Sequence, residues 1–182
     1  MTPLLIPTRN RPTSLSNVLR YLARFYPSTW VIVADGSDEA HKICNRQNIE
    51  AIKSDLAIDY RPYPAECSYL DRLLDILRSE SCELAIIGSD DDFPMMETLA
   101  KGEAFLQKNS DYSVAVGTLI NLQLKSPTDL AAWPFYARNL GENAPELRAS
   151  RYALVIYNPF LRSAFREVFA AQHVATGFAP PP

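Results

Sequence analysis

Short apolar runs alternate along the first two thirds of the chain with longer segments of helical periodicity. The short runs are rich in Leu, Ile and Val and stop at polar turns, which is typical of buried β-strands. The run at positions 49–52 has the weakest pattern. We expect strands at Leu4–Pro7, Trp30–Ala34, Ile49–Ile52, Ile58–Tyr60 and Leu84–Ile87.

Between these runs, apolar residues recur every three or four positions and predict amphipathic helices. Pro94 stands at the first position of one of them, where proline is favoured because it lacks the N–H that this position leaves unpaired. The expected helices with this pattern contain Leu15–Phe25, Leu70–Leu77 and Pro94–Lys108, and a polar helix is expected at Glu39–Arg46.

The last third of the chain has weaker patterns. Tyr112–Asn121 alternates loosely and indicates one or two strands. Lys125–Ala149 is polar and proline-rich, which indicates a long loop with a short helix or two. Tyr152–Tyr157 is a further candidate strand, and Leu161–Phe169 is a candidate closing helix.

Strands that alternate with helices predict an α/β layer fold with a largely parallel sheet. A chain of 182 residues suits one domain with a substantial core. The apolar fraction of 47% and the charged fraction of 21% are ordinary for a soluble globular protein. In folds of this class, ligands bind at the carboxyl ends of the strands.

Charge and cysteine content narrow the function classes. The net charge of −3 gives no support for nucleic acid as a partner. The three cysteines lack CxxC spacing, which indicates free thiols in a reducing compartment, and a zinc site is not expected from two distant histidines. No signal peptide is visible, and no run reaches the roughly 20 apolar residues of a transmembrane segment. We expect a cytoplasmic protein, either free or peripheral at a membrane through a partner.

Three consecutive carboxylates, Asp90, Asp91 and Asp92, follow the strand at Leu84–Ile87. Adjacent anions repel one another, so a folded chain seldom confines them without a cation or strong donors. Capping of the helix at Pro94 accounts for at most one of the three. Mg²⁺ and Mn²⁺ prefer oxygen ligands and often share them with substrate phosphates. The run therefore predicts a metal that holds a nucleotide diphosphate.

Two other strand ends carry unusual polar residues: Thr8–Arg11 and Asp35–Ser37. Each has a plain alternative, which is a solvated basic loop for the first and turn or N-cap chemistry for the second. Because the carboxyl ends of parallel strands share one rim of a sheet, we expect both segments to meet the acidic run there.

In this order, the three strand ends resemble the GT-A nucleotide-sugar glycosyltransferases of family 2. The matching segments are Leu5–Pro12, Val31–Ser37 and Gly88–Phe93, and the last is similar to the acidic motif of a subgroup with three aspartates and a phenylalanine. The resemblance covers about residues 4–120. It implies a GT-A, Rossmann-like three-layer α/β/α sandwich with a mostly parallel sheet. Within one domain, 1–182, it implies a nucleotide-sugar-binding half at 3–120 and a shortened acceptor-side half at 121–182.

The resemblance implies roles for the residues after the first strand. Pro7, Thr8 and Asn10 would line the base and ribose. Arg9 or Arg11 would face the phosphates of the donor.

The resemblance also implies roles at the other two strand ends. Asp35 would accept a hydrogen bond from a ring N–H of the base, which suits uracil. Arg72 lies near a basic position beside the nucleotide, although its place on an amphipathic helix also suits an exposed salt bridge. Asp90 or Asp91 would contact the ribose. Asp92, with Asp90, would bind Mg²⁺ or Mn²⁺.

The implied reaction is metal-dependent transfer of a sugar from a UDP-type donor to the hydroxyl of a glycan, lipid-linked or protein acceptor, with inversion. A carboxylate would deprotonate that hydroxyl, and Glu142 and Glu146 are the available candidates, with no motif for either. Two alternatives stay open: a remnant that binds nucleotide without transfer, and a nucleotidyltransferase. The second normally has a glycine-rich first loop, whereas the loop here has two arginines and no glycine.

Overall fold

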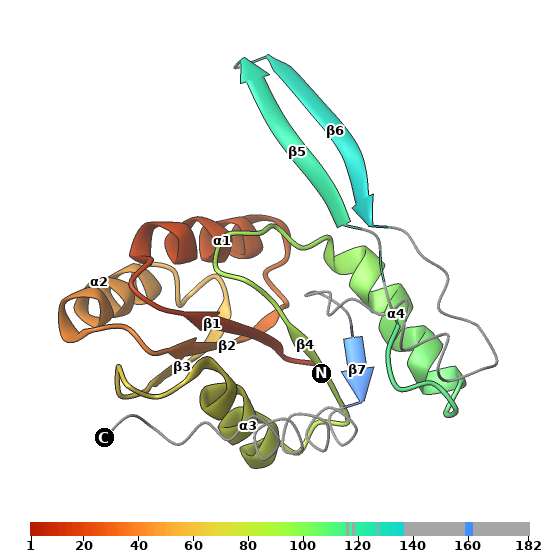
Figure 1. Cartoon of the computed structure of the whole chain (residues 1–182), viewed down its shortest axis with the longest axis horizontal. Helices are drawn as coiled ribbons and strands as arrows, with labels where there is room; N and C mark the ends of the chain where they lie inside the picture. Colours follow the sequence, from red (N-terminus) through yellow and green to blue (C-terminus); the bar gives the residue numbers. More distant parts are fainter. Residues whose placement is uncertain (116, 118, 127, 137–158, 162–182) are drawn as a thin grey trace.

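A computed structural model describes residues 1–115, 117, 119–126, 128–136 and 159–161 of the chain. Its centre is a five-stranded sheet with the order β3-β2-β1-β4-β7 (Figure 1). The first four strands are parallel, and β7 pairs with β4 in the antiparallel direction. The bounds are β1 (Leu4–Thr8), β2 (Trp30–Asp35), β3 (Ala57–Pro62), β4 (Leu84–Ile87) and β7 (Pro159–Leu161).

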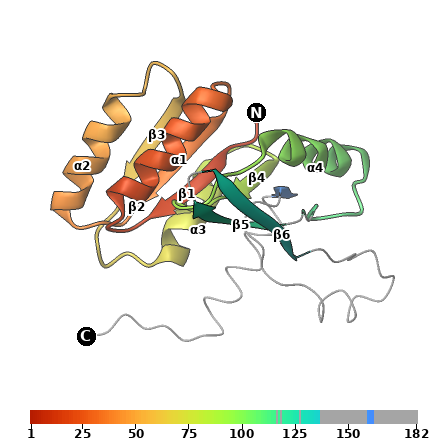
Figure 2. The ribbon, with the colours of Figure 1, turned by 90° about the horizontal axis from the view of Figure 1, so that it is seen from above.

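Helices cover both faces of this sheet. On one face, alternate strand residues such as Leu4 and Ile6 pack under α1, α2 and the start of α4. On the other face, Leu5 and Ile32 pack against α3. Seen from above, α1 and α2 lie side by side over the sheet (Figure 2). The helices are α1 (Pro12–Phe25), α2 (Glu39–Glu50), α3 (Tyr69–Ser79) and α4 (Met96–Lys108).

This arrangement confirms the predicted α/β/α layers with a mostly parallel sheet. Successive residues of a strand point to opposite faces, so a strand that is buried on both faces has to be apolar throughout. In β1 each residue is buried, and all are apolar except Thr8 at its carboxyl end. Helix α1 begins with Pro12 at its first turn and buries one apolar stripe, which consists of Leu15, Val18, Leu19 and Leu22.

The predicted strand at Ile49–Ile52 is wrong, because these residues belong to the end of α2 and the turn after it. Ile49 and Ile52 are buried on the same side as Lys42 and Asn45 of the helix. The spacing of these four positions is helical, but two of them are polar, and this hid the apolar face from the sequence pattern.

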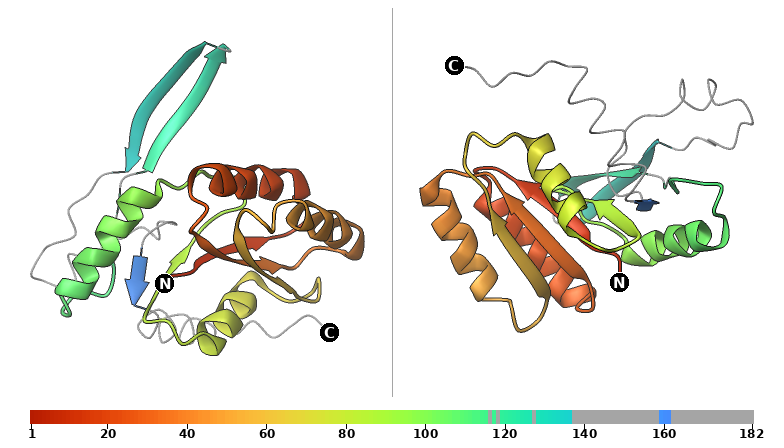
Figure 3. Two further views of the ribbon diagram at one scale, coloured as in Figure 1. Left: turned by 180° about the vertical axis from the view of Figure 1, so that it is seen from behind. Right: turned by 90° about the horizontal axis from the view of Figure 1, so that it is seen from below.

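The predicted loop at Lys125–Ala149 is wrong over its first part, where the structure has a β-hairpin. Strands β5 (Leu119–Ser126) and β6 (Asp129–Tyr136) pair in the antiparallel direction and stand away from the body of the protein (Figures 1 and 3). Pro134 argued against a strand, yet it pairs with Ile120 beside a register shift, which is a position that tolerates proline.

Two smaller expectations also change. Helix α4 begins at Met96 and not at Pro94, whose carbonyl oxygen accepts a hydrogen bond from the Tyr21 hydroxyl at 3.0 Å. Leu161 lies in β7 and not in a helix. The candidate strand at Tyr152–Tyr157 and the rest of the predicted closing helix lie outside the described residues. No helix in the described part is long and apolar enough to cross a bilayer.

Candidate functional site

The carboxyl ends of β1, β2 and β4 meet at one rim of the sheet. The register places Thr8 directly beside Asp35, and the amide of Gly88 donates to the carbonyl of Leu5 at 2.7 Å. The segments that follow these strands are joined by hydrogen bonds from the Asn10 backbone amide to Ser37 and from the Arg11 guanidinium to Asp90. The expected convergence of three polar strand ends is therefore present in the fold.

Asp35 ends β2 and is completely buried. Its Oδ1 atom accepts from the Ser37 amide at 2.8 Å. Its Oδ2 atom accepts from the Asn45 side-chain amide and from the Tyr60 hydroxyl, each at 2.7 Å. The carboxylate thus receives donors from its own loop, from α2 and from β3, which fixes its orientation.

The surroundings of Asp35 keep it ionised. Burial alone would raise its pKa, but the hydrogen bonds from Ser37, Asn45 and Tyr60 outweigh burial, and the pKa lies below the ordinary value. An ionised carboxylate only accepts hydrogen bonds. A ligand N–H has to share Oδ1 with the Ser37 amide or displace one of the donors.

The loops after β1 and β2 are tied together by Asn10. Its backbone amide donates to the Ser37 hydroxyl at 2.8 Å, and its side-chain oxygen accepts from the Asp38 amide at 2.9 Å. Asn10 adopts a positive φ of 56°, a left-handed conformation that asparagine tolerates better than most residues. The structure therefore uses Asn10 to hold the two loops in one shape.

Arg72 is buried on α3, with 3% of its surface exposed, although its helix pattern also suited an exposed salt bridge. Its Nη1 atom donates to the carbonyl oxygens of Thr8 at 2.8 Å and Ala34 at 2.7 Å. Burial lowers its pKa, yet a guanidinium stays charged in proteins. Among the described contacts, Nη2 donates no hydrogen bond. Arg72 therefore brings a buried positive charge to the ends of β1 and β2.

The acidic run is held by the loop after β1. The Thr8 hydroxyl donates to Oδ2 of Asp90 at 2.7 Å. Arg11 donates from Nη1 to Oδ1 of Asp90 at 2.8 Å and from Nη2 to Oδ2 of Asp91 at 2.5 Å. The Ser89 hydroxyl donates to Oδ1 of Asp91. Asp90 is buried, whereas Asp91 and Asp92 are exposed.

The pKa values of Asp90 and Asp91 are shifted in opposite directions. Burial raises the pKa of Asp90, against the opposing effect of Thr8 and Arg11. The hydrogen bonds from Ser89 and then Arg11 lower the pKa of Asp91. The Asp90 carboxyl is therefore harder to ionise than the Asp91 carboxyl.

The chemistry of the acidic run fits a divalent metal. Two of its carboxylates already converge on one cation, the Arg11 guanidinium, which stands in for a metal charge. Within the described residues, no three metal-binding side chains gather into a preformed cage. Mg²⁺ does not need one, because it usually takes one or two carboxylates and completes its shell with phosphates and water. Asp90 and Asp92 would hold such an ion.

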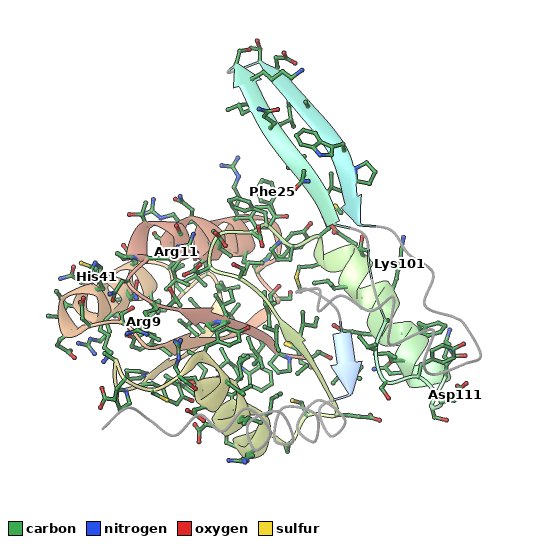
Figure 4. The ribbon with its side chains drawn as sticks, in the orientation of Figure 1. Arg9, Arg11, Phe25, His41, Lys101 and Asp111 are labelled. Atoms are coloured by element: carbon green, nitrogen blue, oxygen red, sulfur yellow. The ribbon has the colours of Figure 1, made fainter. Side chains whose placement is uncertain are left out.

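The remaining expected site residues divide into two groups. Pro7 is buried in β1 and Arg9 is exposed just after it. Figure 4 shows Arg9 and Arg11 near the carboxyl end of β1. Glu142 and Glu146 lie outside the described residues, so their catalytic role stays a prediction.

Sequence analysis missed the residues that support Asp35. Asn45 and Tyr60 come from α2 and β3, and neither belongs to a recognisable motif. One signal was available: a buried helix face that includes an asparagine needs a polar partner nearby. The Asn45 Oδ1 atom has no partner among the described residues.

The protein resembles known proteins in its structure, whereas comparisons of its sequence found no match. No protein-family model matches the chain, and no curated protein sequence matches it. Many solved structures do match in their fold.

Residues 1–349 of S. aureus TarS align with a TM-score of 0.59 at 16% identity, over 92% of this chain and 49% of that one. A mannosyltransferase from Pyrobaculum calidifontis, solved with GDP-Man and Mn²⁺, aligns with a TM-score of 0.52 at 22% identity, over 62% of this chain and 34% of that one. The 4-diphosphocytidyl-2C-methyl-D-erythritol synthase from Anaerococcus prevotii aligns with a TM-score of 0.56 at 14% identity, over 98% and 77%.

These likenesses show a GT-A-like, Rossmann-like fold. The chain spans about half the length of the TarS fragment and about a third of the mannosyltransferase.

Proposed function

We propose that this protein is a metal-dependent glycosyltransferase that moves a sugar from a UDP-type donor to an acceptor hydroxyl, with inversion. One observation carries the proposal: in a GT-A-like fold, Asp35 and the acidic run flank the same loop, Thr8–Arg11, at the ligand-binding rim of the sheet. TarS has also been solved with UDP-GlcNAc, and the mannosyltransferase with GDP-Man and Mn²⁺, which supports the donor class.

Asp35 selects the base in this proposal. Because its carboxylate is ionised and only accepts hydrogen bonds, it favours a base with a ring N–H at the contacted position. Uracil and guanine have such a group. Cytosine and adenine have an unprotonated ring nitrogen there and would face the carboxylate with a lone pair, so the base is expected to be uracil first and guanine second.

The loop after β1 and the acidic run hold the rest of the donor. Pro7, Thr8 and Asn10 line the base and ribose, and Arg9 or Arg11 faces the diphosphate. Arg72 adds a buried positive charge beside the nucleotide.

Asp90 or Asp91 contacts the ribose, and Asp92, with Asp90, holds the metal ion. When bound, that ion supplies charge neutralisation for the departing diphosphate. The chain's own contribution is to orient the donor at this rim.

The proposal is tested by incubating the protein with UDP-GlcNAc and Mn²⁺ and measuring released UDP. Wild type is expected to release UDP by hydrolysis or by transfer to an added acceptor, and Asp92→Ala is expected to be inactive. The exposed Asp111→Ala, away from the rim, is the matched control and is expected to behave as wild type. Equal rates in wild type and Asp92→Ala would refute the proposal.

The two alternatives give different results in the same experiment. A binding-only remnant binds UDP with Mn²⁺ but releases none from UDP-GlcNAc. The structural likeness to the erythritol synthase is the reason to test for a nucleotidyltransferase. Such an enzyme releases pyrophosphate from a nucleoside triphosphate. The glycine-free loop after β1 disfavours that alternative.

A further inference from the structure

The Arg11 side chain bridges two aspartates of the acidic run. Its guanidinium donates to Asp90 at 2.8 Å and to Asp91 at 2.5 Å, so one cation bridges two neighbouring anions. Arg11 lies at the N-cap of α1, but its side chain makes no capping hydrogen bond there. The side chain is therefore engaged with the carboxylates and not with its own helix.

The same contacts occupy every oxygen of these two carboxylates. Asp90 accepts from Thr8 on Oδ2 and from Arg11 on Oδ1. Asp91 accepts from Arg11 on Oδ2 and from Ser89 on Oδ1. A divalent ion binds the lone pairs of carboxylate oxygens, which are the atoms that Arg11 now contacts. Arg11 and a metal ion therefore compete for this part of the run.

We propose that Arg11 is an internal counter-cation of the acidic run, which holds Asp90 and Asp91 in the ligand-free protein and releases them when metal and nucleotide diphosphate bind. After release, the guanidinium turns to the diphosphate. The choice of ligand rests on the proposed function, but the competition with a metal ion does not.

The geometry suits such an exchange. The Arg11 side chain is 48% exposed and Asp91 is 43% exposed, so this pair can open into water. Asp90 is only 5% exposed, and it keeps the Thr8 hydroxyl as a donor when Arg11 leaves, so the incoming metal ion has to replace the charge of Arg11 there. Exposed ion pairs add little to the stability of a fold. A guanidinium binds carboxylates and phosphates with the same planar fork, so one residue can serve both partners in turn.

If this exchange occurs, replacing Arg11 changes the affinity for Mn²⁺ and the affinity for UDP in opposite directions. Arg11→Gln removes the competitor, so Mn²⁺ alone is expected to bind about tenfold more tightly, the order of one charge repulsion across roughly 5 Å of watery surroundings. The same change removes a phosphate partner, so UDP in the presence of saturating Mn²⁺ is expected to bind more weakly. A purely structural role for Arg11 would not strengthen one ligand while it weakens the other.

The test measures Mn²⁺ binding without nucleotide by electron paramagnetic resonance, in wild type, Arg11→Gln, Arg11→Lys and Arg20→Gln. Arg20 is exposed on the same helix, so its replacement matches the change in net charge. Only Arg11→Gln is expected to gain affinity, while Arg11→Lys keeps the positive charge and stays near wild type. Unchanged or weaker Mn²⁺ binding by Arg11→Gln, with an unfolding midpoint like that of wild type, would overturn the proposal.

Failure of this inference is distinguishable from failure of the proposed function. If UDP does not bind wild type with Mn²⁺, the donor site is wrong, and the Mn²⁺ titrations still decide the role of Arg11. If UDP binds as proposed while Arg11→Gln leaves Mn²⁺ affinity unchanged, only the counter-cation role falls.

Discussion

Gly36 lies directly against the guanidinium of Arg72. A methyl group at Gly36 would come within 2.7 Å of the Arg72 Cζ atom and 2.8 Å of Nη1, closer than non-bonded atoms approach. The glycine is therefore required for space, because the buried arginine reaches the ends of β1 and β2 over it. The same guanidinium donates to the carbonyl oxygens of Thr8 and Ala34, so a side chain at Gly36 would disturb both of these hydrogen bonds.

Gly36→Ala is expected to destabilise the fold by about 1–3 kcal/mol, because the guanidinium has to leave its two carbonyl partners. The free energy of unfolding in urea measures this cost. In an Arg72→Met background the obstacle is gone, so the same glycine substitution is expected to cost clearly less. Equal costs in the two backgrounds would contradict the contact.

Arg72→Met by itself is expected to lower the free energy of unfolding by about 1–3 kcal/mol. The Thr8 carbonyl retains the Gly36 amide as a donor at 3.1 Å, but the Ala34 carbonyl loses its side-chain partner beside the buried core. Arg78→Met, on the exposed side of the same helix, is the matched control. Urea unfolding of both variants tests the assignment, and similar small losses would show that Arg72 is dispensable for the rim.

The buried Asp35 predicts a specific pH dependence of stability. Donors hold its folded-state pKa below the ordinary value of about 3.9, so its carboxylate stabilises the fold above that pH. This contribution is lost as the pH falls through the folded-state pKa. Wild type is therefore expected to lose stability more steeply than Asp35→Asn between about pH 4.5 and pH 2.5. Tyr60→Phe removes one donor and should give an intermediate slope.

Urea unfolding at several pH values measures these slopes. The carboxylates outside the Asp35 site titrate in all three proteins, so only the differences between the slopes report on Asp35. Identical slopes for wild type and Asp35→Asn would contradict the proposed network of donors.

The β5–β6 hairpin is expected to tolerate polar substitutions at its exposed leucines. Leu122 and Leu124 are 62% and 69% exposed. Replacing both by glutamine is expected to change the free energy of unfolding by less than about 0.5 kcal/mol. Leu19→Ala, in the buried face of α1, is expected to cost about 2–5 kcal/mol. A loss above 1 kcal/mol for the hairpin variant would mean that its apolar face is covered in the protein.

The parts of the fold that sequence analysis predicted are those with unmixed patterns. The strands at β1, β2 and β4 are continuous apolar runs that stop at polar turns, and each was located within a residue or two. The rule that strand ends share a rim then places Thr8, Asp35 and Asp90 together from the sequence alone. This step required no knowledge of side-chain positions.

The missed parts depend on contacts between distant segments. Helix α2 buries Lys42 and Asn45 on the face that carries Ile49, so its apolar period was broken by residues whose partners lie elsewhere. Asn45 is buried because Asp35 needs a donor, a requirement that only the fold reveals. The burial of Arg72 beneath the rim could not be predicted from the sequence either, because a polar position on an amphipathic helix more often faces water.

The central claim is that the rim binds a nucleotide diphosphate through a metal ion at the acidic run. Isothermal titration calorimetry of UDP into wild type and Asp92→Ala, each with and without Mn²⁺, measures this directly. The account predicts binding to wild type with Mn²⁺, weakened more than about tenfold by omission of Mn²⁺ or by Asp92→Ala, and much weaker binding of CDP than of UDP. No binding of UDP to wild type with Mn²⁺, or binding that is indifferent to both Mn²⁺ and Asp92, would contradict it.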